Sequence, residues 1–242
     1  MLRSDPRVAD VVVHGSIGRG EADAYSDLDI TVFTVPEHQA EFVGDWPAWL
    51  AQITPTVFAR TPIAPFVLNT VTAEGLTLDL LIVPAGTPPY ARPAGFAVGM
   101  LSGARYTEPA AALDYAVAEC LRGLAGPFRS FLERGEHVTH MTGCAHILGL
   151  LTTVMLIETG SDPATVKRVS AALNDEQRTA LEALPALRPT RDDIAAFGLA
   201  VAGETLRRAR PLFVTYELEW PAALEVVARR RVTEMGFVFS DA

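Results

Sequence analysis

The chain is poor in cysteine and carries no excess of positive charge. Its two cysteines, Cys120 and Cys144, are too few for a disulfide framework, so the sequence predicts a protein of the reducing cytoplasm. The formal net charge is −9, which argues against long nucleic acid as a partner, because polyanion binding draws mainly on lysine and arginine. The acidic balance favours a small cationic partner instead.

Long apolar runs are also missing. No uninterrupted apolar stretch reaches the ~20 residues that a membrane-spanning helix needs, and the first residues lack the apolar core of a secretion signal. We therefore expect no membrane partner. Hydrophobic residues nevertheless make up 49% of the 242 positions, so the chain has enough apolar side chains for one large or two small folded cores.

Two aspartates stand at the start of a predicted strand. The β-branched run 11–13 leads into Gly15 and Ser16, which is typical of a buried strand that ends in a tight turn. Ten residues later, Asp27 and Asp29 precede the apolar run 30–33. Because side chains alternate along a strand, both aspartates are expected on one face, while Leu28 and Ile30 enter the core.

A third aspartate lies in a predicted hairpin. The runs 66–71 and 76–83 flank a turn at Glu74 and Gly75, and the alternating register places Asp79 on the same face as Thr77. Clustered carboxylates on one face predict a site for a hard cation such as Mg²⁺, which is usually held by one or two carboxylates together with substrate phosphates.

The turn before the two aspartates is suited to a phosphate. Gly15 lets the backbone approach an anion closely, the Ser16 hydroxyl can donate to its oxygens, and Arg19 adds a charged donor. Two other phosphate-binding patterns fail here. The glycines at 15, 18 and 20 have the reverse of the dinucleotide-binding spacing, and no Gly-Lys-Ser/Thr follows as a Walker sequence requires.

The pattern Gly15-Ser16, ten residues, Asp27-x-Asp29, with Arg19-Gly20 inside the spacer and Ser26 before the first aspartate, resembles the nucleotidyltransferase superfamily. That family includes DNA polymerase β and the small antibiotic adenylyltransferases, and the resemblance covers about the first 85 residues. It implies that Asp27, Asp29 and Asp79 hold two Mg²⁺ ions, and that the donor is a nucleoside triphosphate, most simply ATP. It also implies a small hydroxyl-bearing acceptor of the aminoglycoside or lincosamide class.

The fold class expected from these patterns is α+β. A small mixed β-sheet with helices, including one at 37–52, is predicted for a catalytic domain over residues 1–86. Residues 87–242 are predicted to form a helical bundle that binds the acceptor, with a homodimer among the expected assemblies. The expected helices of the bundle are 108–134, 137–159, 162–172, 175–184, 190–210 and 220–231, followed by a short strand at 236–240.

Lys167 stands out because it is the only lysine in a chain rich in arginine. A position that keeps a compact ammonium group where arginine is otherwise used favours a role for that group. Some relatives place a lysine of the second domain on the triphosphate, and the resemblance extends this role to Lys167. The competing interpretation is an ordinary surface lysine.

Several assignments stay open at the level of sequence. Asp79 could serve as general base as well as metal ligand, and other carboxylates compete for that role: Glu74, Glu119, Glu133, Glu136 and Glu158. A zinc site on residues 137–146 is a weaker alternative, because His137, His140 and Cys144 share a helix face while His146 points away. A protein acceptor, as in antitoxin-like transferases, and a catalytically silent nucleotide-binding protein remain alternatives to the small-molecule acceptor.

Overall fold

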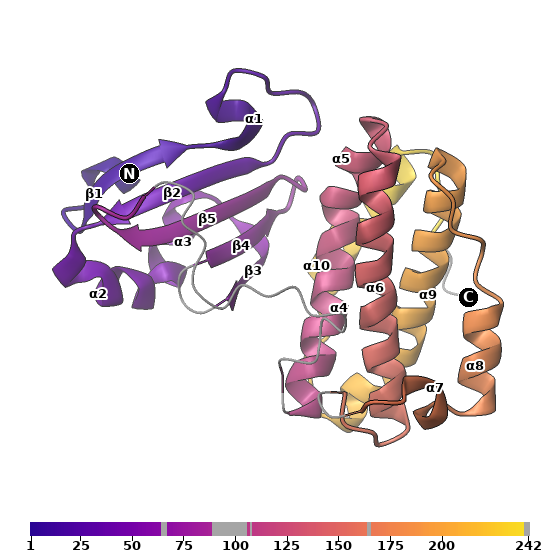
Figure 1. Cartoon of the computed structure of the whole chain (residues 1–242). Helices are drawn as coiled ribbons and strands as arrows, with labels where there is room; N and C mark the ends of the chain where they lie inside the picture. The colour runs from indigo at the N-terminus through magenta and orange to yellow at the C-terminus, as the bar shows by residue number, and fades with distance from the viewer. Residues whose placement is uncertain (64–66, 89–105, 107, 164–165, 240–242) are drawn as a thin grey trace. The chain divides into compact units, whose positions relative to one another are not determined.

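The computed structural model describes residues 1–63, 67–88, 106, 108–163 and 166–239. Contacts divide the chain into two compact units, Met1–Ala97 and Val98–Ala242. The first unit is a sheet with helices, and the second is entirely helical over its described residues, as Figure 1 shows. This confirms the predicted α+β class. The predicted assignment of catalysis and acceptor binding to separate domains, with its boundary at residue 86, stays a prediction.

In the part of the first unit that the structure describes, five strands form a mixed sheet with the order β1-β2-β5-β4-β3. Only the β2·β5 pair of this sheet is parallel, and the other neighbours are antiparallel. The predicted hairpin is confirmed as β4 and β5, with Gly75 at a φ of +83° after the turn. The strands are β1 (Val8–Val13), β2 (Leu28–Thr34), β3 (Thr56–Ile63), β4 (Val67–Thr72) and β5 (Thr77–Pro84).

Helices cover one face of this sheet and leave the other face to the polar residues. Alternate side chains of β2, β4 and β5 enter a core with α2 and α3, visible along one face of the sheet in Figure 1. Trp49 stacks on Phe42 at 4.9 Å and donates its indole N–H to the Phe42 carbonyl at 2.9 Å. The helices of this unit are η1 (Leu2–Ser4), α1 (Gly15–Gly18), η2 (Pro36–His38), α2 (Gln39–Gly44) and α3 (Trp46–Ile53).

The second unit is built around α4, α6 and α9, which pack against one another. Gly198 allows α9 to approach α5, because a Cβ at this position would meet the Phe128 ring at 2.6 Å. The buried Arg208 of α9 binds Glu158 of α6 at 2.7 Å and Glu176 of α8 at 2.6 Å. The helices are α4 (Pro109–Ala125), α5 (Pro127–Glu133), α6 (His137–Glu158), α7 (Val169–Ala172), α8 (Asp175–Glu182), α9 (Arg191–Thr215) and α10 (Ala222–Glu234).

Helix α6 is long and apolar enough to cross a membrane by length and mean hydropathy, and it is the one such helix in the described part of the chain. This does not contradict the expectation drawn from the sequence, in which no uninterrupted apolar run reaches that length. Helix α6 mixes apolar side chains with threonine, glycine and histidine, and only its mean hydropathy reaches the level of a spanning helix. Just over half of its most apolar stretch is buried, and it packs against α4 and α9, as a core helix does.

Other differences from the predicted elements have local causes. Two expected helices are each divided before a proline, at Pro47 and Pro127, because proline fits the first turn of a new helix and not the interior of an old one. The expected helix at 162–172 is reduced to α7, although residues 164 and 165 lie outside the described part. The expected strand at 236–240 is absent over 236–239, and residue 240 lies outside the described part.

Candidate functional site

A row of polar side chains crosses the sheet on the face away from α2 and α3. Asp29 of β2 is in register with Asp79 of β5, and Asp79 is in register with Asn69 of β4. Asn69 is in turn in register with Arg60 of β3. Next to the first aspartate, the His14 amide donates to the Asp29 carbonyl at 2.8 Å. Residues in register share a face of a sheet, so side chains from five segments of the sequence converge on one line.

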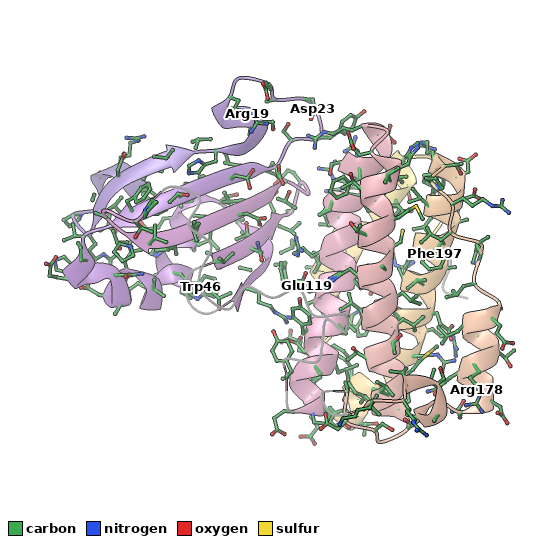
Figure 2. The ribbon with its side chains drawn as sticks, viewed as in Figure 1. Arg19, Asp23, Trp46, Glu119, Arg178 and Phe197 are labelled. Atoms are coloured by element: carbon green, nitrogen blue, oxygen red, sulfur yellow. The ribbon has the colours of Figure 1, made fainter. Side chains whose placement is uncertain are left out.

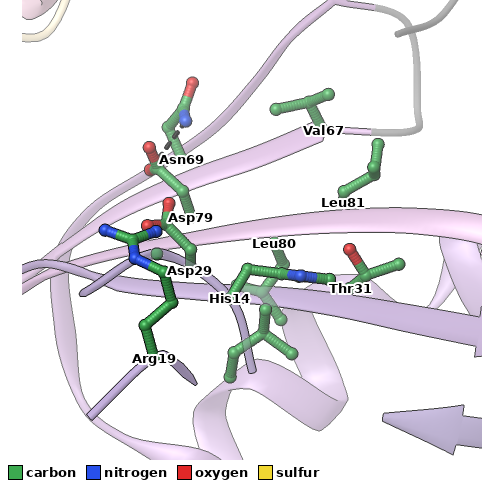
Figure 3. A pocket seen from close by; sticks show the side chains of 11 residues that line it. His14, Arg19, Asp29, Thr31, Val67, Asn69, Asp79, Leu80 and Leu81 are labelled. Carbon is green, nitrogen blue, oxygen red and sulfur yellow. Dashed lines mark hydrogen bonds between the residues drawn. The ribbon is translucent and has the colours of Figure 1, made fainter. Parts of the chain in front are cut away.

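A pocket of about 370 Å³ opens over the middle of this row. Asp29 and Asp79 line it side by side, and Asn69 donates its side-chain N–H to Oδ1 of Asp79 at 2.7 Å, drawn as a dashed line in Figure 3. Apolar and hydroxyl groups extend the lining beyond the carboxylates. These are Ile30, Thr31, Val67, Leu80 and Leu81. The pocket thus combines a charged part with a less polar one, as small-molecule sites commonly do.

The electrostatics of the pocket centre on Asp29. Its pKa is raised above the ordinary value by burial first, and then by the negative charges of Asp27 and Asp79, while His14 acts in the opposite direction. Burial and like charges both disfavour an ionised carboxylate. A bound cation would reverse the second effect, so the arrangement is suited to a positively charged ligand.

Gly15 is required by the geometry of the turn. It has a φ of +62°, a conformation that residues with a Cβ rarely adopt. A Cβ at this position would also lie far inside the van der Waals distance of Asp29 Oδ2. The absence of a side chain at Gly15 therefore lets the turn pass directly beside the carboxylate, and both the turn and the carboxylate line the pocket.

Ser16 and Arg19 lie on the same turn with different surroundings. The Ser16 hydroxyl donates to Ser26 Oγ at 2.8 Å, and Ser26 donates to the Asp23 carboxylate at 2.9 Å, which ties the turn to the segment before β2. Arg19 lines the pocket and pairs with Glu21 at 2.7 Å, where both side chains are exposed. Figure 2 labels Arg19 and Asp23 in this segment. Arg19 therefore supplies a positively charged donor at the pocket.

The structure brings together only part of the predicted metal-binding set. Asp29 and Asp79 converge, whereas Asp27, one residue before β2, does not line the pocket. Within the described ranges, no three His, Cys, Asp or Glu side chains are grouped closely enough to hold a metal ion. Two oxygen-donor carboxylates still fit Mg²⁺, because this ion commonly takes one or two carboxylates and completes its shell with phosphate and water.

Lys167 lies in the other unit, exposed in a bend just before α7. Its role at the triphosphate stays a prediction. The helical-unit carboxylates that competed for the role of general base have partners of their own. Glu119, labelled in Figure 2, is 5% exposed and binds Arg122 at 2.9 Å, and Glu158 accepts from Gln177 at 2.7 Å. Glu133 accepts from Arg191 at 3.0 Å, and Glu136 accepts from Thr139 at 3.3 Å.

The histidine-rich segment is part of the packing of α6 against α5. The ring of the buried His140 contacts Phe128 edge-on at 4.9 Å and Phe131 at 5.6 Å. Burial, and then the neighbouring His137, lower the pKa of His140 to about 4, so the ring is neutral at physiological pH. These contacts account for the histidine without a metal ion.

Sequence reasoning missed three members of the row: His14, Asn69 and Arg60. A signal for Asn69 was present, because a hairpin that turns at residues 73–75 places residue 69 opposite residue 79. His14 adjoins the predicted turn and could have been included with it. Arg60 had no comparable signal, because β3 was not predicted as a strand.

Comparison with known proteins agrees with the first unit. Residues 1–75, just under a third of the chain, match the family model described as "Nucleotidyltransferase domain". This confirms the predicted resemblance for these residues. The match includes Gly15, Ser16, Asp27 and Asp29 and ends before Asp79, which is tied to the site by sheet register alone.

A solved structure, an aminoglycoside 6-adenyltransferase from Bacillus subtilis, is similar over 96% of this chain and 93% of that chain, with 13% identity and a TM-score of 0.45. At that identity and TM-score the likeness is too weak to establish a shared activity. The search of curated protein sequences returned no match.

Proposed function

We propose that residues 1–86, which include the nucleotidyltransferase match at 1–75, form the catalytic domain of an enzyme that transfers a nucleoside monophosphate to a hydroxyl group of a small molecule. The donor in this proposal is ATP, and the acceptor is of the aminoglycoside or lincosamide class. The observation that carries the proposal is the pair Asp29 and Asp79, held in register on adjacent strands beside the Gly15 turn.

The carboxylates would hold the divalent cations of the reaction. Asp29 and Asp79 offer oxygen ligands inside the pocket, and Asp27 is near enough for its charge to act on Asp29. In this proposal Asp27, Asp29 and Asp79 would hold two Mg²⁺ ions, whose positive charge would favour ionisation of the acceptor hydroxyl and departure of pyrophosphate. Neighbouring carboxylates repel one another, and a bound cation relieves this repulsion whereas a neutral ligand does not. The cluster therefore favours cations.

The turn residues would hold the triphosphate. Gly15 keeps the backbone open beside Asp29, and Ser16 can redirect its hydroxyl from Ser26 to a phosphate oxygen. Arg19, whose ion pair with Glu21 is exposed, can supply positive charge. These groups act by positioning and by electrostatic stabilisation, which are the main contributions of a protein to phosphoryl transfer.

Asp79 has a second role to offer. Its two carboxylate oxygens are inequivalent, because Oδ1 accepts a hydrogen bond from Asn69. A carboxylate within hydrogen-bond reach of the acceptor hydroxyl suffices as a general base. The less polar part of the pocket, with Thr31, Val67 and Leu81, lies beside this residue and is available to the acceptor or the nucleoside.

The test is incubation of the full chain with Mg²⁺, each of the four labelled nucleoside triphosphates and a panel of hydroxyl-bearing acceptors. We expect acceptor-dependent release of pyrophosphate and transfer of the label from ATP. Asp29→Asn should abolish transfer, and Asp27→Asn should do the same, while each variant keeps the wild-type far-UV circular dichroism.

Glu37→Gln is a matched control, because it also removes one negative charge from the first unit, at an exposed position in η2. It should transfer like the wild type. Wild-type turnover in both aspartate variants would refute the metal-binding assignment. Nucleotide binding without transfer to any small or protein acceptor would indicate a catalytically silent protein, and transfer to a protein alone would replace the acceptor class.

A further inference from the structure

Asn69 lines the pocket and is hydrogen-bonded to Asp79, one of its two carboxylates. It lies on β4 directly opposite Asp79 of β5, and its side-chain N–H donates to Asp79 Oδ1 at 2.7 Å. Figure 3 shows this contact at the edge of the pocket, with Asp29 on the other side of Asp79 in the row. The contact joins side chains of two strands whose backbones are already paired, so it is not needed to set their register.

The hydrogen bond restricts the orientation of the carboxylate. The last torsion of an aspartate side chain is broad and has no strong preference of its own, so an unassisted carboxylate rotates freely. A donor held at Oδ1 by the sheet selects one orientation of the carboxylate. Because the amide is neutral, it orients the carboxylate without placing a positive charge where a cation would bind.

We propose that Asn69 is a positioning residue for Asp79 and thereby sets the affinity of the pocket for a divalent cation. The inference rests on the proposed function, in which Asp79 is a metal ligand. Outer hydrogen-bond partners of metal ligands typically change metal affinity or activity by about 10–100-fold when they are replaced. An effect of that size is expected for loss of the Asn69 amide.

Two substitutions distinguish the effect of the Asn69 hydrogen bond on Asp79 from the effect of the size of the side chain at position 69. Asn69→Asp keeps the size of the side chain and turns the donor into an acceptor that repels Asp79. Asn69→Leu keeps similar bulk and removes hydrogen bonding. The probe is Mn²⁺ added to the metal-free full chain without nucleotide, with bound and free ion distinguished by electron paramagnetic resonance. Asn69→Leu should weaken Mn²⁺ binding about 10–100-fold.

A second readout separates positioning from general damage to the fold. If Asn69 acts through Asp79, raising the Mg²⁺ concentration should restore most of the kcat of Asn69→Leu, whereas a damaged fold would not respond to metal. Asn69→Gln, which keeps an amide donor on a longer side chain, should recover part of the Mn²⁺ affinity. Gln52→Leu is the matched control, because it removes an exposed amide on α3, a helix on the opposite face of the sheet, and should bind Mn²⁺ like the wild type.

The outcomes distinguish the inference from the proposed function. If wild type and Asp29→Asn bind Mn²⁺ equally, the pocket is no metal site, and both proposals fail. If Asp29→Asn weakens binding while Asn69→Leu and Asn69→Asp bind like the wild type, only the role of Asn69 is overturned. Should Asn69→Leu fail to fold, as judged by near-ultraviolet circular dichroism, Asn69→Ala decides, because it removes the amide donor without adding a charge or a metal ligand.

Discussion

The surroundings of Asp29 destabilise the protein without a cation and favour the binding of one. It is partly buried beside two other carboxylates, and this environment raises its pKa in the absence of a cation. The same environment provides the negative charge that attracts a cation. A site of this kind destabilises the empty protein and is stabilised by its ligand, because whatever binds only the folded state adds its binding free energy to the stability.

This predicts the effect of Asp29→Asn on stability. For a carboxylate whose pKa is raised by folding, stability is lost as the pH rises from the ordinary value of 3.8 through the raised value, and the loss persists at neutral pH. With EDTA at pH 7, Asn at this position should therefore raise Tm above that of the wild type. The gain should shrink as the pH falls through the raised pKa of Asp29, because the wild-type carboxyl then takes up its proton.

Thermal unfolding followed by circular dichroism at pH 7 and pH 4 checks this, with Glu37→Gln as the control for removal of an exposed charge. Addition of Mg²⁺ should reverse the order at pH 7, because only the wild type keeps the full ligand set. A Tm at or below that of the wild type in EDTA at pH 7 would contradict the raised pKa.

At the scale of the structural elements, the turn that begins α1 requires a glycine at position 15. Gly15→Ala combines a strained φ with a collision between the new methyl group and Asp29 Oδ2. We expect the turn or the carboxylate to move, so that transfer falls at least ~10-fold, because displacement of a catalytic group by about 1 Å can cost ~100-fold in rate. The measurement is kcat and the Mg²⁺ concentration for half-maximal rate.

The control for this variant is Gly44→Ala at the end of α2. Gly44 is exposed and a Cβ there meets nothing within 4 Å, so the same chemical change should leave transfer unaltered. Full activity in Gly15→Ala would mean that Asp29 does not need its present position, which would weaken its assignment as a metal ligand.

Elements with strong local signals were predictable. The hairpin of β4 and β5 followed from two apolar runs around a Glu-Gly turn, and α6 and α9 followed from long helical periodicity. Strand β3 was missed because Arg60 and Pro62 interrupt its apolar pattern and a proline in a run argues against a strand. Its place at the edge of the described sheet explains why it tolerates a proline.

The candidate site was predictable where one short motif supplied it. Gly15, Ser16, Asp27 and Asp29 fall within fifteen residues, so spacing alone suggested them. Asp79 was found because it interrupts an apolar strand. The alignment of Asp29 with Asp79 depends on the parallel pairing of β2 and β5. These strands are neighbours in the sheet, but η2, α2, α3, β3 and β4 lie between them in the sequence. Such a pairing is decided by the packing of the whole sheet, and no local pattern encodes it.

At the scale of the whole molecule, the packing of the helical unit makes its stability depend on pH. His140 has a pKa lowered to about 4 in the folded state, against 6.5 as its ordinary value. Between these two pH values, His140 is protonated in the unfolded chain and neutral in the folded chain. The free energy of unfolding therefore falls as the pH drops from 6.5 toward 4, by up to ~3 kcal/mol.

Urea unfolding at pH 7 and pH 5 measures this dependence. His140→Leu should flatten it, whatever its effect on stability at pH 7, while His38→Leu, at an exposed position, should leave the slope unchanged. An equal slope in His140→Leu and the wild type would show that His140 is accessible to protons in the folded protein.

Lys167 poses the question of whether the two units act together. The carboxylate row belongs to the first unit and Lys167 to the second, so a contact between Lys167 and the triphosphate would require both units in one active enzyme. Lys167→Ala should then slow turnover by about 10²–10³-fold, the loss typical of a group that stabilises charge in the transition state. Lys167→Arg should restore little, because a planar guanidinium does not replace a compact ammonium.

Chemical modification gives a test that does not depend on turnover. Since Lys167 is the only lysine, an amine-reactive reagent can modify only this side chain and the N-terminal amine, and mass spectrometry resolves the two. ATP with Mg²⁺ should protect Lys167, exposed in the free protein, and leave the N-terminal amine as an internal control. If ATP binds without protecting Lys167, and Lys167→Ala turns over like the wild type, the charge on the triphosphate must be met by Arg19 or another arginine.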